Sequence, residues 1–327
     1  MNTQCKVCRQ SNENKVYIVR EMMFGYKDEF EYFECTHCGC LQIVSVPDNL
    51  GKYYPAHYYS IADVPDIAKP NPFGSYIKQL RLRYYLKGKG FLQKLVLKTL
   101  GSPRLYSWMK KENLDPSFKI LDVGCGTGYL LLALRQMGFS KLQGIDPFIE
   151  SDIEYKNGVR VEKKDLSEIS GQFDLVMLHH SFEHMPDPVS TFKDLYRLVK
   201  PKRYLLIRIP IFPSFAWRKY GINWVQLDAP RHLFLHSIQS IQRLADGVGF
   251  SIQEIVYDST PLQFWGSEQY VSGIPHRDER SYYHGSFRND QRGSIFSAAD
   301  IEEFRAKASY LNNVGDGDQA CFYLVKN

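Results

Sequence analysis

The sequence predicts an α/β protein in which a mixed sheet of seven strands carries helices on both faces, preceded by a small cysteine-bearing unit. Apolar strand patterns alternate with helical patterns from residue 119 to residue 327, and this alternation is typical of βαβ units. Two Cys-x-x-Cys pairs stand near the start of the chain. In such pairs a tight turn can aim two thiolates at one metal ion.

Bulk composition fits a soluble globular protein. The chain has 327 residues, 44% hydrophobic and 24% charged, which is enough for one large domain and a smaller one. No apolar run approaches the roughly 20 residues that span a bilayer, and the opening sequence MNTQCKVCRQ lacks the apolar core of a signal peptide. We therefore expect a cytoplasmic protein whose seven cysteines serve metal binding rather than disulfides.

Residues 1–48 are expected to form a zinc ribbon. The cysteine pairs flank two short alternating patterns at 15–20 and 29–34, which predict strands. The four predicted ligands are Cys5, Cys8, Cys35 and Cys38. Four thiolates complete the tetrahedral coordination of zinc, so the ion would be structural rather than catalytic. The alternative is a coincidental pair of Cys-x-x-Cys sequences.

Residues 49–115 are expected to form an aromatic linker and a basic helical cap. The linker carries four tyrosines in the sequence KYYPAHYYS at 52–60. Tyr58 and Tyr59 are candidates for binding the substrate, because a phenol offers both stacking area and a hydroxyl. The alternative is that these rings pack the ribbon against the main domain.

The segment 67–111 holds eleven Lys and Arg and no Asp or Glu, and its apolar and glycine pattern predicts helices from about residue 75. Three interpretations stay open: a solvated helical cap, a patch for anionic acceptors such as nucleotide-sugar pyrophosphates, or docking on an anionic membrane surface. The last would place the protein at the inner membrane face with a lipid-linked acceptor. No nucleic acid is expected, because no recognisable RNA or DNA module accompanies the charge.

The sequence KILDVGCGTG at 119–128 predicts a buried strand, a glycine turn and the start of a helix. Gly124 and Gly126 let the backbone approach a ligand closely, and the helix start offers unpaired N–H groups and a partial positive charge. A dinucleotide fingerprint needs a third glycine, where this chain has Tyr129. The turn therefore favours a nucleoside cofactor other than a dinucleotide.

The elements after this turn continue the alternation. Further strands are predicted at 142–146, 159–162, 173–178, 204–209, 250–257 and 320–326, with helices at about 128–137, 189–199, 237–248 and 296–311. Asp146 ends the second strand, where a carboxylate can accept hydrogen bonds from both ribose hydroxyls of a nucleoside. The piece 213–236 is too long for an ordinary connection, so we expect a functional insertion on the substrate side.

Residues 116–327 are expected to form a catalytic domain, because their motifs resemble those of the class I (Rossmann-like) S-adenosylmethionine-dependent methyltransferases. The motifs stand in the expected order: LDVGCGTG, GIDP, KKDL, FDLVMLHHSFEHMPDP, KPKRYLLIRIP and DAPRHLF. The cysteine ribbon followed by KYYPAHYYS resembles a subgroup found among sugar and surface-polysaccharide biosynthesis enzymes. One departure is Lys202-Arg203, where the family has Gly-Gly; we expect it to affect a turn rather than catalysis.

The resemblance implies a binding site for S-adenosylmethionine. Its residues would be Asp122, Gly124, Gly126, Gly128, Asp146, Asp165, Leu166 and His179. The glycines would line the methionine part of the cofactor, with Asp122 ordering their loop, and Asp146 would take the ribose. Asp165 and Leu166 would face the adenine edge, and His179 would lie beside the sulfonium. For Asp165 the alternative is an ordinary helix N-cap.

Ionisable residues follow the fourth strand, where the methyl group would lie. A sugar hydroxyl must lose its proton to react, and an imidazole of pKa about 6.5 suits a general base near neutral pH. We therefore expect His180 or His184 as the base, with Glu183 in the same catalytic group. The alternative is that Glu183 and His184 merely fix the loop.

The segment His180-x-x-Glu183-His184 also resembles the E-x-x-E-H motif with which ubiquinone-pathway and small-RNA methyltransferases bind a divalent ion. Its first position is His rather than Glu, and His232 could supply a fourth ligand. Imidazole and carboxylate ligands suit zinc, iron or manganese. We nevertheless expect activity without added metal.

Arg231 and His232 lie in the insertion and complete the candidates for binding the acceptor. Arg231 could meet a phosphate, because a guanidinium binds phosphate oxygens in pairs. The alternative is an aromatic packing cluster in which Arg231 makes a structural ion pair.

Together these features predict methyl transfer from S-adenosylmethionine to a carbohydrate-type acceptor, a sugar or nucleotide-linked sugar, with O-methylation favoured over C-methylation. Two other functions stay open: a small-molecule, quinone-like O-methyltransferase, and a ribbon-mediated binding protein with a vestigial cofactor pocket. The intact glycines and Asp146 argue against the last, because a binding-only protein could lose them freely.

Overall fold

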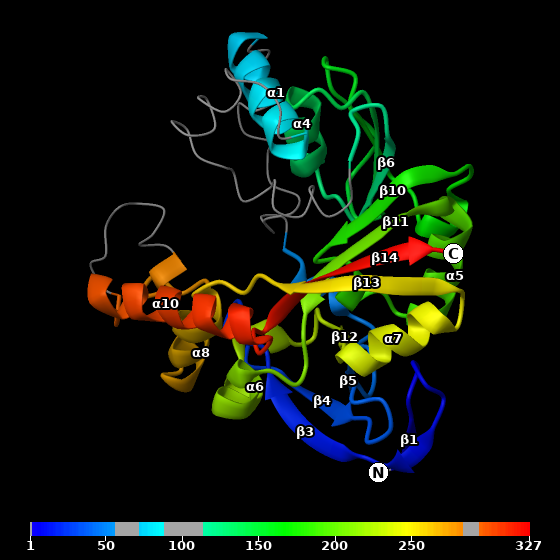
Figure 1. The fold of residues 1–327 in the computed structure, drawn as a ribbon. Coiled ribbons are helices and arrows are strands. Elements are labelled where there is room, and N and C mark those ends of the chain that lie inside the picture. Colours follow the sequence, from blue (N-terminus) through cyan, green and yellow to red (C-terminus); the bar gives the residue numbers. More distant parts are fainter. Residues whose placement is uncertain (1, 56–71, 88–113, 284–293) are drawn as a thin grey trace.

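The computed structural model describes residues 2–55, 72–87, 114–283 and 294–327. The candidates Tyr58 and Tyr59 and most of the basic segment 67–111 lie outside these ranges. An eight-stranded sheet forms the centre of the described molecule, with strand order β13-β14-β11-β10-β6-β7-β9-β8. Figure 1 shows the helices arranged on both sides of this sheet and the N-terminal strands below it.

Five parallel strands form the middle of the sheet: β6 (Lys119–Val123), β7 (Lys141–Ile145), β9 (Arg160–Glu162), β10 (Phe173–His179) and β11 (Val199–Pro210). Most of their residues are apolar and buried, as expected for strands that are covered on both faces. β10 pairs with β6 on one side and with β11 on the other. The strand order therefore reverses between β6 and β10, which is where open parallel sheets bind ligands.

Antiparallel strands form both edges of the sheet. β13 (Phe250–Tyr257) pairs with β14 (Gln319–Lys326), which pairs with β11. The predicted number of seven strands is wrong by one, because β8 (Ile153–Glu154) adds an antiparallel pair to β9 at the other edge. A strand of two residues carries no readable alternation, so the sequence pattern missed it.

Helices cover opposite faces of the sheet. α4 (Tyr129–Gln136) buries its leucines against Ile120 and Leu175. α5 (Pro188–Leu198) and α7 (Ile238–Asp246) pack against the alternate residues of the same strands, so they lie on the other face (Figure 1). Both of these helices begin at a side chain that accepts backbone N–H groups, which is the expected N-cap signal.

The ribbon forms a second sheet that is completed by the insertion. β3 (Lys15–Arg20), β4 (Glu29–Glu34) and β5 (Leu41–Ile43) pair antiparallel, and β12 (Phe234–Leu235) extends the sheet beyond β5. The strands predicted at 15–20 and 29–34 are confirmed. A separate hairpin joins β1 (Asn2–Gln4) to β2 (Ser11–Glu13). Apolar residues of the ribbon belong to the same core as α5 and α7, so the ribbon and the main sheet share one interior.

The insertion 213–236 lies between the ribbon and the main sheet. α6 (Phe215–Tyr220) and the 3-10 turns Gly221–Asn223 and Val225–Leu227 precede β12. Trp224 and Phe234 are fully buried in the shared core. The segment reaches the edge of the ribbon sheet, and its aromatic rings fill the space between. Its expected place on the substrate side stays a prediction.

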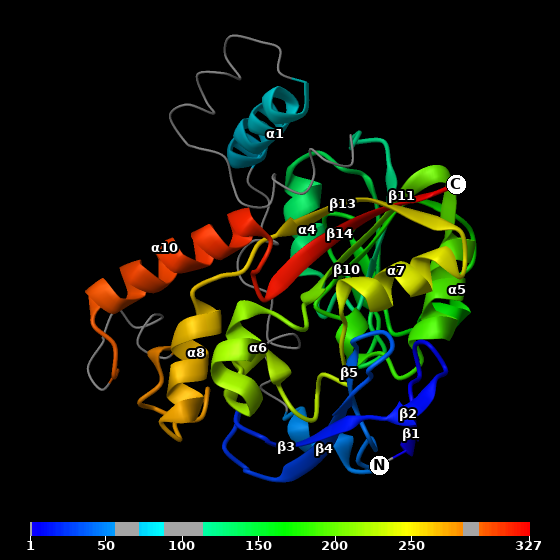
Figure 2. The same cartoon turned by 60° about the horizontal axis from the view of Figure 1, so that its bottom comes forward.

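The remaining helices lie at two places around the sheet. α1 (Pro72–Lys87), which falls within the predicted helical segment, packs on α4 through the buried Leu82 and a hydrogen bond from Lys78 to Gln136. α8 (Leu262–Val271) and α10 (Ala298–Val314) lie beside α6, as Figure 2 shows. Among the helices of the described ranges, none combines the length and apolar character that crossing a membrane requires.

Candidate active site

A cavity of about 720 Å³ opens at the carboxyl ends of β6, β7 and β10. It stands at the point where the strand order reverses, as the topology predicts. Its lining includes seven of the eight predicted cofactor residues and both predicted bases, namely Asp122, Gly124, Gly126, Asp146, Asp165, Leu166, His179, His180 and His184. The glycine turn (124–128) and the histidine segment (179–184) are far apart in sequence. They nevertheless face one cavity.

The glycine turn needs its glycines for backbone reasons. Gly124 has φ of +70°, and a Cβ atom there would lie 2.4 Å from the Cβ of Ser181. Gly128 has φ of +84° and begins α4, where a Cβ would lie 2.7 Å from Val161. Gly124 thus lets the turn press against the histidine segment that follows β10. Gly128 is not among the residues that line the cavity, and its positive φ lets the chain enter α4.

Asp146 is the carboxylate that orders the glycine turn. Its Oδ2 accepts the Gly126 N–H at 2.8 Å and its Oδ1 accepts the Phe148 N–H at 2.9 Å. This corrects the sequence expectation, which gave the ordering role to Asp122. Asp122 is buried and lines the cavity, and burial and the nearby Asp146 raise the pKa of its carboxyl well above 3.8. A cationic ligand would favour the ionised form of Asp122.

Asp165 combines both interpretations of its role. It lines the cavity with Leu166, as predicted. It also begins the 3-10 helix Leu166–Glu168, and its backbone N–H donates to the Glu168 carboxylate at 2.7 Å in a capping box. The cap holds this segment at the rim of the cavity.

His179 ends β10 and lines the cavity. Burial, with help from the nearby Arg208 and His180, lowers the pKa of His179 to about 3. The imidazole is therefore neutral at physiological pH. A neutral ring can lie beside a cationic ligand without repelling it.

His180 is not available as a base, which corrects one predicted role. A guanidinium can only donate, so Arg208 Nη1, at 2.6 Å, donates to His180 Nε2. His180 Nδ1 must then carry the proton and donate to Glu183 Oε1 at 3.3 Å. Both ring nitrogens are occupied, and the residue has a φ of +55°, which is unusual for a side chain other than glycine.

Glu183 lies behind the cavity rather than in it. Its side chain is fully buried, and its Oε2 has no hydrogen-bond partner among the described atoms. Burial raises the pKa of this carboxyl, but the hydrogen bond from His180 and the imidazoles of His184 and His232 outweigh burial and lower it to about 2. Glu183 is therefore a buried carboxylate that positions the histidines around it and does not itself face the cavity.

His184 is the predicted base that retains a free lone pair. Its Nδ1 lies 2.8 Å from the backbone carbonyl of Arg231. A carbonyl only accepts, so Nδ1 carries the proton and Nε2 is bare in the neutral ring. Burial and the neighbouring His232 lower the pKa of His184 below its usual 6.5. The ring is thus neutral and able to accept a proton at pH 7.

Tyr54 is a cavity residue that the sequence analysis did not single out. Its hydroxyl lies 3.2 Å from His184 Nδ1, and its ring is parallel to that of Phe148 with centroids 6.0 Å apart. The adjacent Tyr53 is buried and donates to Asp28 in the ribbon. The described part of the tyrosine tract therefore divides between the two interpretations: one ring packs and the next lines the cavity.

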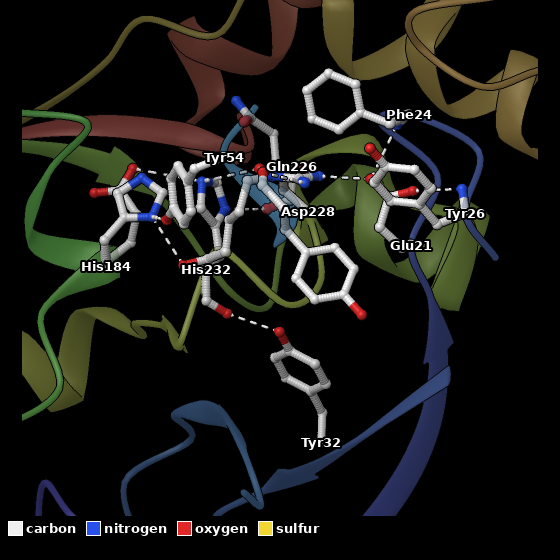
Figure 3. A network of polar contacts seen from close by, with 12 residues as sticks. Glu21, Phe24, Tyr26, Tyr32, Tyr54, His184, Gln226, Asp228 and His232 are labelled. Carbon is white, nitrogen blue, oxygen red and sulfur yellow. Dashed lines mark hydrogen bonds and ion pairs between the residues drawn. The ribbon is translucent and has the colours of Figure 1, made fainter. Parts of the chain in front are cut away.

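His232 lies beside Glu183 and His184, and these three side chains could hold a cation. One ligand atom from each lies within 4.8 Å of the others. His232 donates from Nδ1 to the Gln226 carbonyl at 2.7 Å, which leaves its Nε2 bare (Figure 3). His180 is outside this group, so the metal motif suggested by the sequence is not reproduced in its predicted form. His232 does not line the cavity, in contrast to its predicted contact with the acceptor.

Arg231 does not face an acceptor, and this predicted role is corrected. Its side chain is completely buried and forms ion pairs with Asp228 at 2.6 Å and with Glu21 at 3.1 Å. Because the guanidinium is enclosed by these carboxylates, it cannot meet a phosphate in the cavity. The structural ion pair, which the sequence analysis kept as the alternative, is the observed arrangement.

The four predicted zinc ligands come together in the ribbon. Cys5 Sγ lies 3.6 Å from Cys38 Sγ, Cys8 Sγ lies 3.6 Å from Cys35 Sγ, and all four sulfurs are within 4.8 Å of one another. A tetrahedral zinc with bonds of about 2.3 Å would separate its sulfurs by about 3.8 Å. Gln42 donates to Cys5 Sγ at 3.1 Å, a second contact that would orient a ligand. The donor set therefore fits zinc.

Arg208 was also missed by sequence reasoning. It lies in β11, where its Nε donates to Asp258 at 2.6 Å while its Nη1 holds His180. The sequence did contain a signal for Arg208, because it is a charged residue inside the apolar run YLLIRIP. An arginine in a buried strand needs partners, but the sequence does not say which elements supply them.

Known proteins resemble the chain over its central part. A family model described as a methyltransferase domain matches residues 83–255, more than half of the chain. The ubiquinone biosynthesis O-methyltransferase of Pseudomonas aeruginosa is 34% identical over 111 residues, covering 31% of this chain and 47% of that protein. The corresponding enzyme of Pseudomonas putida is 33% identical over the same coverage. The chain thus spans about half the length of the curated relatives it matches.

Solved structures give weaker similarity. An S-adenosylmethionine-dependent methyltransferase from Mesorhizobium loti has 13% identity and a TM-score of 0.41, with 69% of this chain and 100% of that chain covered. A mycolic acid cyclopropane synthase complexed with S-adenosylhomocysteine has 15% identity and a TM-score of 0.44, with 83% of this chain and 98% of that chain covered.

Proposed function

The chain belongs to the S-adenosylmethionine-dependent methyltransferases, and on that premise we propose that it methylates a hydroxyl of a carbohydrate-type acceptor with His184 as the base. The observation that carries this proposal is the position of His184. Its imidazole is neutral with a bare Nε2, and it lines the same cavity as the glycine turn. The ribbon cysteines would hold a structural zinc ion.

The donor side of the cavity has the groups that S-adenosylmethionine needs. When bound, the cofactor supplies an activated methyl group on a sulfonium. Asp146 would take the ribose, since each of its oxygens accepts one backbone N–H and keeps a further lone pair. Asp122 and the neutral His179 would lie at the cationic end, and Leu166 at the adenine edge.

The acceptor side must remove one proton. A neutral hydroxyl is a poor nucleophile, and its proton has to leave as its oxygen bonds to the methyl carbon. His184 Nε2 can take this proton while Nδ1 keeps its own and continues to donate to the Arg231 carbonyl. The buried carboxylate of Glu183 then faces an imidazolium, which it stabilises.

Polar side chains at the start of α5 support a sugar acceptor. Asp187, Ser190 and Asp194 line the cavity, and carboxylates and hydroxyls suit the paired hydroxyls of a sugar. The described lining holds five Asp and one Lys, Lys164. This excess of carboxyl groups favours an acceptor that is neutral near its reacting hydroxyl over one that carries a phosphate there. A nucleotide phosphate would have to find its cations outside the described lining, for example in the basic segment 67–111.

A small-molecule, quinone-like acceptor is the second candidate. The relatives named above are ubiquinone biosynthesis O-methyltransferases, and the cavity has an aromatic side formed by Tyr54, Tyr129 and Phe148. A planar phenol could stack there. Because the match to these relatives spans 111 residues, 47% of the length of the Pseudomonas aeruginosa protein, their substrate is an alternative rather than the leading proposal.

An acceptor panel tests the proposal. The full chain is first titrated calorimetrically with S-adenosylmethionine, and is then incubated with S-adenosylmethionine and free sugars, nucleotide sugars or catechol-type phenols. Mass spectrometry reports the gain of one methyl group, with the His184→Gln variant as the control. We expect methylated sugar. Methylation of phenols alone would establish the alternative acceptor, and methylation of a carbon atom would overturn the assignment of O-methylation.

A further inference from the structure

We propose that Arg231 is a positioning residue for His184: its guanidinium fastens the insertion to the cysteine ribbon, and its backbone carbonyl thereby selects the tautomer of His184. This inference rests on the proposed function, because it takes His184 as the base. It gives the N-terminal ribbon a role in the active site although the predicted zinc ligands do not line the cavity.

The guanidinium of Arg231 joins three segments of the chain. It donates twice to Asp228 within the insertion, at 2.6 and 3.0 Å. It donates to Glu21 in the ribbon at 3.1 Å and to the Tyr53 carbonyl of the linker at 3.2 Å. The ring of Phe24 lies 5.3 Å from its central carbon. Only a planar fork with several donors can make these contacts at once.

Glu21 is itself fixed by the ribbon. Its Oε1 accepts the Phe24 N–H at 2.9 Å, and its Oε2 accepts the Tyr26 N–H at 3.0 Å. Figure 3 shows these three residues grouped on the side of the network away from His184. The carboxylate is therefore a rigid anchor for Arg231, held by the turn between β3 and β4.

A second contact holds the same segment. The Tyr32 hydroxyl, on β4, donates to the carbonyl of His232 at 2.9 Å in the buried interior, as the dashed line in Figure 3 indicates. The next residue, Leu233, donates its N–H to the Glu183 carbonyl at 2.9 Å and accepts from the Ile43 N–H at 3.0 Å. The backbone at 231–233 is thus held between the ribbon and the histidine segment.

The held backbone decides which nitrogen of His184 carries the proton. The Arg231 carbonyl lies 2.8 Å from Nδ1, and the tautomer of a histidine is set by the hydrogen bond that one nitrogen makes. With the carbonyl in place, Nε2 is the nitrogen that can accept a proton. If the carbonyl moves, the proton can transfer to Nε2, and the ring no longer presents its lone pair on that side.

Nitrogen-15 NMR of histidine-labelled protein tests this inference without an acceptor. The ring nitrogens of His184 are assigned by their loss in His184→Gln. In the unmodified chain we expect a protonated Nδ1 and a bare Nε2. In Arg231→Lys, which keeps a charge but loses the fork, we expect a substantial fraction of the Nε2-protonated form.

A matched control and a fold control accompany the variant. Arg218→Lys changes a half-exposed arginine of the same insertion that pairs with Asp316, and it should leave the His184 tautomer unchanged. The affinity for S-adenosylmethionine should stay within about twofold in both variants, because the donor side is untouched. A folded Arg231→Lys protein with His184 still fully protonated at Nδ1 would overturn the inference.

A milder variant covers the case in which Arg231→Lys does not fold. Tyr32→Phe removes one hydroxyl and its hydrogen bond to the His232 carbonyl. It should also shift a measurable fraction of His184 to the other tautomer. An unchanged His184 tautomer in this variant would again overturn the inference. The turnover of His184→Gln tests the proposed function separately. If this variant keeps its turnover, His184 is not the base, whichever ring nitrogen carries the proton.

Discussion

The proposed donor and acceptor sides of the cavity are built in different ways. Most of the donor side comes from one stretch of chain, residues 122–166, in which a glycine turn is tied to Asp146 by a backbone hydrogen bond. His179 joins it from the end of β10. The acceptor side brings together Tyr54, His184 and Arg231 from three distant segments. It depends on a ribbon whose cysteines are not in the cavity.

This difference predicts which substitutions should damage each side of the cavity. Local backbone geometry holds the donor side, so single changes within the turn should damage it and changes in the ribbon should not. Long-range contacts hold the acceptor side, and these include a buried guanidinium between two carboxylates. Removing one partner of such a group is costly, because an unpaired charge is left inside. The following experiments separate the two sides.

Breaking the cysteine cluster should have the largest effect. Cys38→Ser removes one of four zinc ligands, and loss of a structural zinc costs several kcal/mol, which corresponds to a fall in Tm on the order of 10 °C. Zinc content by elemental analysis and a thermal melt measure this. Cys321→Ser, at a buried cysteine of β14 outside the cluster, is the control. Unchanged zinc content and Tm in Cys38→Ser would contradict the zinc assignment.

Removing the proposed base should strongly lower turnover while sparing the donor side. His184→Gln is expected to lower kcat by about 10²- to 10⁴-fold, the usual contribution of a positioned general base. The affinity for S-adenosylmethionine should change less than about twofold. Steady-state kinetics with the acceptor found by the panel and calorimetry measure the two quantities. A large loss of cofactor affinity would show that the two sides are not separable.

Filling the glycine turn should chiefly weaken cofactor binding. Gly124→Ala places a Cβ 2.4 Å from that of Ser181 at a φ of +70°, and a strained conformation and an overpacked contact together cost about 2–4 kcal/mol. Much of this should appear as weaker cofactor binding, by about 100-fold for 2.7 kcal/mol. Gly51→Ala, where no atom lies within 4 Å, is the control. Calorimetric titration decides, and wild-type affinity in Gly124→Ala would argue against this site.

The pH dependence of kcat/KM should report the state of His184. The base works only when neutral, and burial lowers the pKa of His184 below 6.5. Activity should therefore be level from pH 7 to pH 8 and should fall as the pH drops through that lowered pKa, by about tenfold per pH unit below it. An acid limb above pH 7 in the full kinetic profile would exclude His184 as the titrating base.

Chelation should have the smallest effect. We expect activity without added metal, so a chelator that leaves the ribbon folded and its zinc bound should not change turnover. Activity, zinc content and Tm are measured on the same sample. Loss of turnover at constant zinc content and Tm would instead assign a required cation to Glu183, His184 and His232, whose ligand atoms lie within 4.8 Å of one another.

The sequence predicted most of the fold because its elements carry local signals. The glycine turn, the strands at 15–20 and 29–34 and the long parallel strands of the sheet were readable from period and turn chemistry. β8 was missed, because a strand of two residues has no period. Lys202, a departure from the family pattern, has a φ of +60° within β11, where the pairing of β11 with β10 shifts register.

The candidate site was only partly predictable. Residue types predicted side chains that line the cavity beside the glycine turn, such as Asp122 and Asp146, and their contact with a cofactor stays a prediction. They did not distinguish His180 from His184, because the difference lies in Arg208 and in the Arg231 carbonyl. Nor did they reveal that Arg231 is enclosed, since Glu21 is 210 positions away.

By itself the sequence determined most strands of the sheet and the paired cysteines, because alternation, turn residues and the Cys-x-x-Cys spacing are local signals. The tertiary structure alone decided which histidine keeps a bare nitrogen and which arginine is buried. These properties depend on a carbonyl, a guanidinium and a carboxylate brought together from separate segments. A hydrogen bond requires partners within about 3 Å, and only the folded chain sets that distance.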